Sequence, residues 1–191
     1  MDIVRMFRTD EEILTGLMSG KETAFKELFD RYYMPLCLYS LQITDSFDIA
    51  EDVVQDFFVT FWEKKIYRQV RENLRHYLFY CIRNASLALV KEKKTILLEE
   101  VEEEACSLPD EMLDEEELAA KQTVLEESLK QLPRQCSYIF MEIVLHGRKY
   151  KEVAEELNIS VNSVKTQLSR ALKRLRGSLQ MIILLLLKKK D

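Results

Sequence analysis

The stretch HGRKYKEVAEELNISVNSVKTQLSRALKRLRGSL, residues 146–179, contains two short amphipathic segments separated by a turn. The first segment covers 149–157 and the second begins at Val161, with Asn158 and Ile159 between them. Ser160 is a residue type that caps the N-terminus of a helix. Apolar residues recur at helical spacing in both segments, at Val153, Ala154, Leu157, Val164, Leu168, Ala171 and Leu175. The pattern predicts a short helix, a tight turn and a longer helix.

The polar side of the second helix carries the pattern of a DNA-recognition helix. Five of the residues from 160 to 176 are basic and none is acidic. Short and amide side chains come first, where base edges would be reached, and cations follow, where phosphates would be met. The predicted DNA-binding residues are Asn162, Ser163, Lys165, Thr166, Gln167, Ser169, Arg170, Lys173, Arg174 and Arg176. An ordinary solvated basic face is the alternative interpretation.

The composition of the whole chain favours an all-α fold. The 191 residues include only four glycines and three prolines, too few turn residues for a chain of many short strands. Leu, Glu, Lys, Ala and Arg dominate, and these residue types favour helices. We therefore predict an all-α fold, and the length leaves room for one ordinary domain or two small ones.

Four helices are predicted in the first half of the chain. They cover 10–19, 22–41, 46–65 and 74–94, with Gly20 closing the first and Pro35 expected to kink or split the second. The third helix has apolar residues at i, i+3 and i+4 over four turns. Its opposite face is acidic, which suits either solvent or a protein partner, and carries Asp48, Glu51, Asp52, Gln55 and Asp56.

Charge is unevenly distributed along the chain. Residues 99–117 hold eleven acidic residues and no basic one, which indicates a self-repelling tether. Residues 119–191 hold 14 basic and 7 acidic residues. We expect a first domain at 10–95, an acidic linker at 96–114 and a second domain at 115–180, beginning with helices at 115–131 and 134–146.

The tail, 181–191, joins an apolar run to basic residues. The run Met181–Leu187 is seven residues long, whereas a membrane-spanning helix needs about 20. We expect it to extend the last helix and pack on the second domain, with a sticky face for an inhibitor or a second copy as the alternative. The N-terminus has no secretory signal pattern, so a cytoplasmic location is expected.

Three stretches resemble the extracytoplasmic-function (ECF) branch of the sigma-70 family of RNA polymerase sigma factors. DIAEDVVQDFFVTFWEKK, residues 48–65, resembles the region 2 helix of that family. LRHYLFYCIRNASLALVKEKK, residues 74–94, resembles the helix after it, including the Arg83-Asn84 pair. The stretch from Leu129 to Arg176 resembles region 4. The order and spacing of the blocks also match, over about two-thirds of the chain.

The resemblance implies a role for each part. The acidic face of 46–65 would dock on the β′ clamp helices of core RNA polymerase, region 4 would read the −35 element and contact the β flap, and the linker would follow the RNA path. An anti-sigma factor is implied as a further partner. The residues implied for −10 contact are Tyr67, Arg68, Arg71, Arg75, Tyr77, Arg83 and Asn84. Aromatic and cationic side chains are also what holding an unpaired base requires.

No catalytic constellation and no cofactor motif occurs in the sequence, so we expect a sigma factor that is not an enzyme. A stand-alone helix-turn-helix regulator is the first alternative, but residues 1–95 lack the alternating strands and helices of a receiver domain. A polymerase-binding adaptor that does not touch DNA is the second, and the basic helix argues against it.

Overall fold

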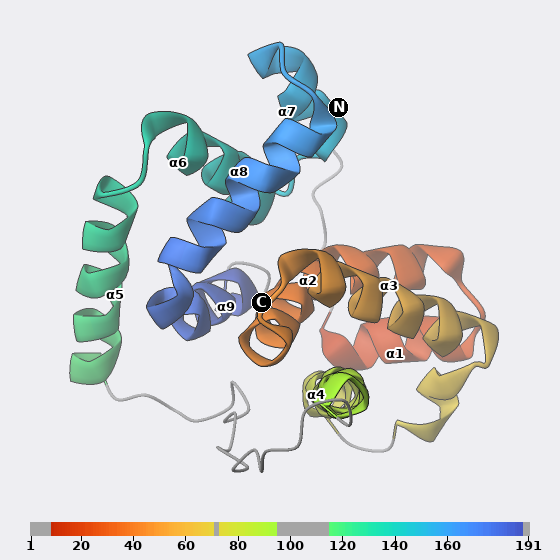
Figure 1. Cartoon of the computed structure of the whole chain (residues 1–191). Helices are drawn as coiled ribbons and strands as arrows, with labels where there is room; N and C mark the ends of the chain where they lie inside the picture. The colour runs from red at the N-terminus through yellow and green to blue at the C-terminus, as the bar shows by residue number, and fades with distance from the viewer. Residues whose placement is uncertain (1–8, 71–72, 95–114, 189–191) are drawn as a thin grey trace, which may run out of the picture. The chain divides into compact units, whose positions relative to one another are not determined.

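The computed structural model describes residues 9–70, 73–94 and 115–188, and within these ranges every regular element is helical. The all-α prediction is thereby confirmed. The chain divides into two compact units, Met1–Glu111 with Leu185–Asp191, and Met112–Leu184. The expected acidic linker, 96–114, lies outside the described residues. Figure 1 shows both units, and each is described by itself.

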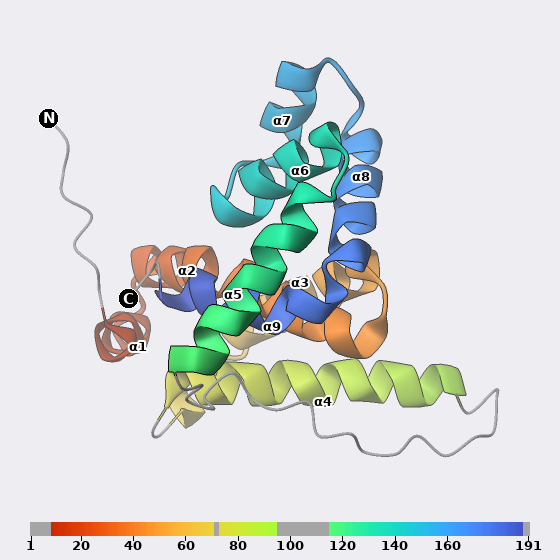
Figure 2. The same ribbon diagram turned by 90° about the vertical axis from the view of Figure 1, so that its left-hand side faces the viewer.

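The first unit is built around one long helix. Helix α2 (Glu22–Thr44) packs against α1 (Asp10–Met18), α3 (Phe47–Glu63) and α4 (Leu74–Lys94). A 3-10 turn, η1 (Ile66–Gln69), connects α3 to the chain before α4. Helix α4 is seen end-on in Figure 1 and along its full length in Figure 2.

Local signals in the sequence set the helix ends of the first unit. Thr9 and Glu12 form a capping box, in which the Glu12 amide donates to Thr9 Oγ1 at 3.3 Å and the Thr9 amide donates to Glu12 Oε2 at 3.0 Å. Gly20 has φ +70°, the left-handed conformation that glycine adopts at low cost. The His76 amide donates to Asn73 Oδ1 at 2.9 Å, so Asn73 caps α4.

Of the two outcomes expected for Pro35, a kink or a split of the second helix, the split does not occur. Helix α2 is continuous from Glu22 to Thr44, and Pro35 is buried within it. Proline inside a helix costs about 3 kcal/mol. Fully buried residues on both sides of Pro35, including Leu28, Tyr32, Leu36 and Leu38, pack both halves of α2 into the core and offset that cost.

The second unit contains α5 (Glu115–Lys130), α6 (Arg134–Phe140), α7 (Tyr150–Leu157) and α8 (Val161–Arg174). The helical path of α6 continues through a π turn, η2 (Met141–Leu145), before Gly147, which has φ +69°. Helix α8 lies against α6 and α7 (Figures 1 and 2). Buried Ile139, Phe140, Val153, Leu168 and Leu172 belong to these three helices.

The apolar run near the C-terminus does not extend α8, contrary to expectation. Helix α8 ends at Arg174, and a 3-10 turn, η3 (Arg176–Ser178), precedes a separate helix, α9 (Leu179–Lys188). Gly177 lies in this break, and glycine is a poor helix former. Among the described residues, no helix has the length and hydrophobicity needed to cross a membrane.

Candidate nucleic-acid interface

Helices α7 and α8 form a helix-turn-helix with well-formed caps. Asn158 ends α7 in the left-handed conformation, with φ 52°. The Ser163 amide donates to Ser160 Oγ at 3.0 Å, so Ser160 caps α8 as predicted. The expected core side is also present: all the predicted apolar positions are buried except Leu157, which is half-buried. Because α7 and α8 pack on each other across this short turn, the orientation of α7 fixes that of α8.

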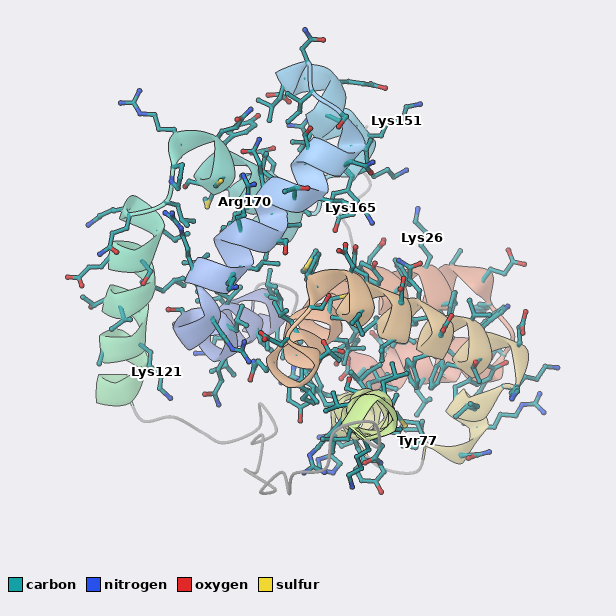
Figure 3. The ribbon with its side chains drawn as sticks, in the orientation of Figure 1. Lys26, Tyr77, Lys121, Lys151, Lys165 and Arg170 are labelled. Atoms are coloured by element: carbon teal, nitrogen blue, oxygen red, sulfur yellow. The ribbon has the colours of Figure 1, made fainter. Side chains whose placement is uncertain are left out.

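The side of α8 opposite this core is exposed and free of acidic residues. At about 100° of rotation per residue, Asn162, Thr166, Ser169 and Lys173 fall on one line along the helix, with Arg170 beside them, and all five are exposed. Figure 3 shows Lys165 and Arg170 on this helix. Arg174 and Arg176 continue the exposed positive charge beyond the end of the line.

Gln167 does not belong to this exposed face, which corrects its predicted place among the DNA-facing residues. Its Nε2 donates to Gln135 Oε1 at 3.1 Å, and Cys136 Sγ donates to its Oε1 at 3.7 Å. Gln167 therefore lies against α6. The apolar stripe of α8 is wide enough that residues at its edge contact a neighbouring helix, and only the packing partner decides which edge residues do so.

Two further predicted residues lie at the margins of the exposed face. The Lys165 ammonium lies 5.3 Å from the centre of the Tyr150 ring, so this half-buried side chain is held against α7 by a cation–π contact. Ser163 Oγ and Ser160 Oγ share a hydrogen bond of 2.9 Å. The most accessible face of α8 is thus narrower than the sequence predicted.

The acidic side of α3 is exposed at Asp48, Asp52, Gln55 and Asp56, but not at Glu51. Glu51 is 2% exposed, and its Oε1 accepts a hydrogen bond of 3.2 Å from the Tyr33 hydroxyl. Gln55 Nε2 donates to the same hydroxyl at 3.0 Å. The expected exposure of Glu51 is wrong because this position lies on the stripe of α3 that packs on α2.

The residues predicted for −10 contact are divided by the structure. Tyr67 is 3% exposed and its ring centre lies 5.9 Å from that of Phe61 and 6.1 Å from that of Trp62, so it is a core residue, which corrects its predicted accessibility. Arg68 and Asn84 are exposed, and Arg75, Tyr77 and Arg83 are half-buried. Arg71 lies outside the described residues.

Burial also raises the pKa values of two tyrosines near these positions. The pKa of Tyr32 is raised, mainly because the side chain is buried and also because of the Asp10 charge, while Arg75 acts in the opposite direction. The Tyr32 hydroxyl donates to Asp10 Oδ2 at 2.5 Å, and Arg31 Nη1 pairs with Asp10 Oδ1 at 2.9 Å. This cluster joins the start of α1 to α2. The pKa of Tyr77 is also raised, mainly by burial.

One exposed aromatic residue was missed by the sequence interpretation. Tyr80 is 53% exposed on α4. Residues three or four positions apart share a helix face, so Tyr80 forms an exposed stripe with Asn73, His76, Asn84 and Lys91. No acidic residue occurs from 73 to 91. The signal was available in the sequence, as an amide, a histidine and an aromatic at helical spacing without an acid.

Comparisons with known proteins agree with this geometry. Residues 122–175 match the family model for sigma-70, region 4. An ECF RNA polymerase sigma factor, SigL of Mycobacterium tuberculosis, is 23% identical over 171 residues, which cover 87% of this chain and 95% of SigL.

Two solved structures are similar as well. CnrH in complex with the cytosolic domain of CnrY has a TM-score of 0.39 and 20% identity, over 88% of this chain and 95% of that one. The sigma factor RpoE in complex with the anti-sigma factor NepR, from Bartonella quintana, has a TM-score of 0.34 and 21% identity, over 81% of this chain and 96% of that one.

A helix-turn-helix that matches region 4, in a chain matched over most of its length by a sigma factor, is typical of a sigma-70-type transcription initiation factor. The chain is similar in sequence to an ECF sigma factor of the sigma-70 family over most of its length. This similarity supports a sigma-factor function in transcription initiation, and sigma factors are not themselves enzymes.

Proposed function

We propose that the two units of this sigma factor divide promoter recognition between them. The second unit, Met112–Leu184, binds the −35 element through α8. The first unit docks on core polymerase through α3 and contacts the −10 element through α4 and the segment before it. Residues 10–95 carry the polymerase and −10 contacts, residues 115–180 carry the −35 contact, and the residues between them form the tether.

The observation that carries the −35 assignment is the exposed face of α8. Its residues combine small or amide side chains at the N-terminal end with cations at the C-terminal end, and the opposite side is buried. A helix of this kind presents hydrogen-bonding groups to base edges and charge to phosphates. The residues that we assign to DNA are Asn162, Thr166, Ser169, Arg170, Lys173, Arg174 and Arg176, with Ser163 and Lys165 at the margins.

Core polymerase is the partner that we assign to the acidic face of α3. Asp48, Asp52 and Asp56 are exposed carboxylates at helical spacing, with Gln55 beside them, and such a face disfavours DNA. The sequence resemblance supports docking of this face on the β′ clamp helices and of the second unit on the β flap. Glu51 is buried and supports this face indirectly. It accepts a hydrogen bond from the Tyr33 hydroxyl, which in turn accepts one from Gln55.

For the −10 element we assign the exposed residues Arg68, Tyr80 and Asn84, together with the half-buried residues Arg75, Tyr77 and Arg83. Exposed aromatic and cationic side chains suit stacking on unpaired bases and contact with phosphates. Family resemblance further supports a cytoplasmic site of action and control by an anti-sigma factor. The similar structures of CnrH with CnrY and of RpoE with NepR are complexes of this kind for those proteins.

The test of the −35 assignment uses holoenzyme reconstituted with variants of α8. Arg170→Ala should weaken binding to the cognate promoter by roughly 1–3 kcal/mol and relax sequence preference at one position. Lys173→Ala should weaken binding evenly across sequences and reduce the slope of log K against log salt by about one. Lys130→Ala, an exposed cation on α5, is the matched control. If the α8 variants behave like this control, α8 is not the reading helix.

A stand-alone helix-turn-helix transcriptional regulator is the second hypothesis for this chain. It predicts equal promoter affinity with and without core polymerase. The exposed acidic face of α3 disfavours this outcome, because such a face needs a protein partner to contribute to function.

A further inference from the structure

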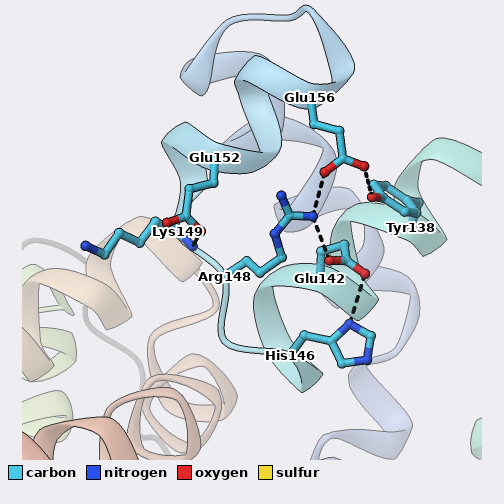
Figure 4. A network of polar contacts seen from close by, with 7 residues as sticks. All are labelled: Tyr138, Glu142, His146, Arg148, Lys149, Glu152 and Glu156. Atoms are coloured by element: carbon cyan, nitrogen blue, oxygen red, sulfur yellow. Dashed lines mark hydrogen bonds and ion pairs between the residues drawn. The ribbon is translucent and has the colours of Figure 1, made fainter. Parts of the chain in front are cut away.

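Arg148 lies at the centre of a polar network in the second unit (Figure 4). One atom, Nη1, lies 2.9 Å from Glu142 Oε2 and 2.6 Å from Glu156 Oε2. Glu142 belongs to the π turn η2, Glu156 to α7, and Arg148 to the loop between them. A single guanidinium therefore joins both sides of the loop that leads into the helix-turn-helix.

Two more side chains extend the network. The Tyr138 hydroxyl, from α6, donates to Glu156 Oε1, and His146 Nδ1 lies 2.9 Å from Glu142 Oε1. The Arg148 backbone amide also donates to the Glu142 carbonyl at 3.0 Å. Each carboxylate is thus held from two directions, which fixes the position of α7 relative to α6 and η2.

These contacts distinguish Arg148 from Arg170 and Lys173, two cations of α8. Arg148 is 32% exposed and faces two carboxylates, whereas Arg170 and Lys173 lie on a helix without acidic residues. A guanidinium already paired with two carboxylates gains little from a phosphate, because those pairs would have to break. Its position before α7, among Lys149 and Lys151, would otherwise suggest a phosphate contact.

We propose that Arg148 is a positioning residue for −35 recognition, which joins Glu142 to Glu156 and so sets the orientation in which α7 presents α8 to the major groove. Helix α8 packs on α7 across a turn of three residues, so a rotation of α7 moves the exposed face of α8 with it. Glu142 lies in the π turn η2, and π turns are frequent at functional sites. This inference rests on the proposed −35 function of the second unit.

The sharpest comparison uses two adjacent glutamates of α7. Glu156→Gln removes one carboxylate from the network, whereas Glu155→Gln removes the same charge from an exposed side chain whose Lys151 partner lies 3.8 Å away. Both changes remove one negative charge from the same turn of α7, so their difference reports the network. Arg148→Lys keeps the charge but not the planar fork of the guanidinium.

The experiment measures holoenzyme affinity for two DNAs: a promoter on which the wild-type holoenzyme initiates, and the same promoter with its −35 element replaced. Glu156→Gln and Arg148→Ala should lower the ratio of these affinities roughly five- to tenfold, while Glu155→Gln leaves the ratio unchanged. The salt slope on the cognate promoter should remain that of the wild type for Arg148→Ala, and Arg148→Lys should restore part of the ratio.

A lower stability alone would reduce the active fraction on both DNAs and leave their ratio unchanged, so the ratio separates positioning from folding. If Arg148→Ala fails to fold, Glu156→Gln carries the test. A salt slope reduced by about one with an unchanged ratio would identify Arg148 as a phosphate contact and overturn the proposal. Equal ratios for Glu155→Gln and Glu156→Gln would also overturn it. If the wild-type holoenzyme bound both DNAs with equal affinity, the −35 function itself would be refuted.

Discussion

At the scale of single residues, we expect polar residues on the two sides of α8 to contribute differently, one to stability and the other to promoter affinity. Gln167 and Arg170 are three positions apart, but Gln167 is bonded to Gln135 of α6 and Arg170 is exposed. Gln167→Ala should reduce the free energy of unfolding by about 1 kcal/mol, the contribution of a typical hydrogen bond. It should change promoter affinity by no more than about twofold.

Measuring thermal unfolding and promoter binding of the same variant separates these effects. Arg170→Ala is the comparison, with the opposite expectation of reduced binding and unchanged stability. A Gln167→Ala variant that folds as stably as the wild type but loses promoter affinity would show that the amide turns from α6 to DNA.

Tyr80 allows a second prediction at the same scale. Its exposed ring on α4 should stack on a base of the opened −10 region, and removing such a contact costs about 1–3 kcal/mol per base. Tyr80→Ala should therefore shorten the lifetime of open complexes, as followed by competitor challenge, while Tyr80→Phe keeps the stacking surface and the lifetime. Equal lifetimes for the Ala variant and the wild type would remove Tyr80 from the −10 contacts.

At the scale of elements, the junction of α6, η2 and α7 should be sensitive to acid. The pKa of Glu142 is held below its ordinary value of 4.5 by hydrogen bonds from Arg148 and then His146, and that of Glu156 by Tyr138 and then Arg148. A carboxyl whose pKa is lower in the folded state stabilises the fold above its unfolded pKa. This stabilisation should be lost as the pH falls below about 4.5.

The Glu142→Gln, Glu156→Gln double variant should show a weaker dependence of unfolding on pH than the wild type. The measurement is unfolding of the full chain, followed by circular dichroism between about pH 7 and about pH 3. Glu155→Gln serves as the control on the same helix. If the double variant retains the full acid sensitivity of the wild type, other carboxyls are responsible for it.

The acidic face of α3 makes the prediction that separates a sigma factor from other helix-turn-helix proteins. Asp52 and Asp56 are four residues apart and exposed, so an Asp52→Arg, Asp56→Arg double change should alter stability by about 0.5 kcal/mol per site at most. It should abolish co-purification with core polymerase, because opposed like charges at an interface cost several kcal/mol. Reversal of Glu11 and Glu22, exposed on α1 and α2, is the control.

Periodicity and capping predicted most of these elements well. Helix α4 has the predicted bounds of 74–94, and α8 begins after its predicted cap, Ser160. Both depend on local signals that a sequence displays. The continuity of α2 through Pro35 was not predictable, because burial of its two halves, not local propensity, outweighs the cost of proline.

The site could be predicted only in part, because the sequence does not show which helix of the fold covers a given residue. Glu51, Tyr67 and Gln167 are polar or amphipathic residues at the edges of buried stripes, and each makes its contacts with another element. A helical period shows that an edge exists but not which neighbour covers it. The Arg148 network was missed for the same reason, since its members are 4 to 18 residues apart in sequence and come from different elements.

At the scale of the whole molecule, charge and fold together favour a factor that works with a partner. The second half of the chain is basic and the stretch from 99 to 117 is strongly acidic. The acidic stretch would oppose binding of the free protein to DNA. If each unit contacts only part of a promoter, as we propose, a third body is needed to space them, and we propose that core polymerase is that body.

The most direct test is run-off transcription on genomic fragments with core polymerase and the purified chain, followed by mapping of start sites. We expect transcripts that depend on adding the chain, begin downstream of a shared pair of −35 and −10 sequences, and disappear with the Asp52→Arg, Asp56→Arg variant. Promoter-specific DNA binding by the chain alone, with no polymerase association and no new transcripts, would contradict a sigma factor and favour a stand-alone regulator.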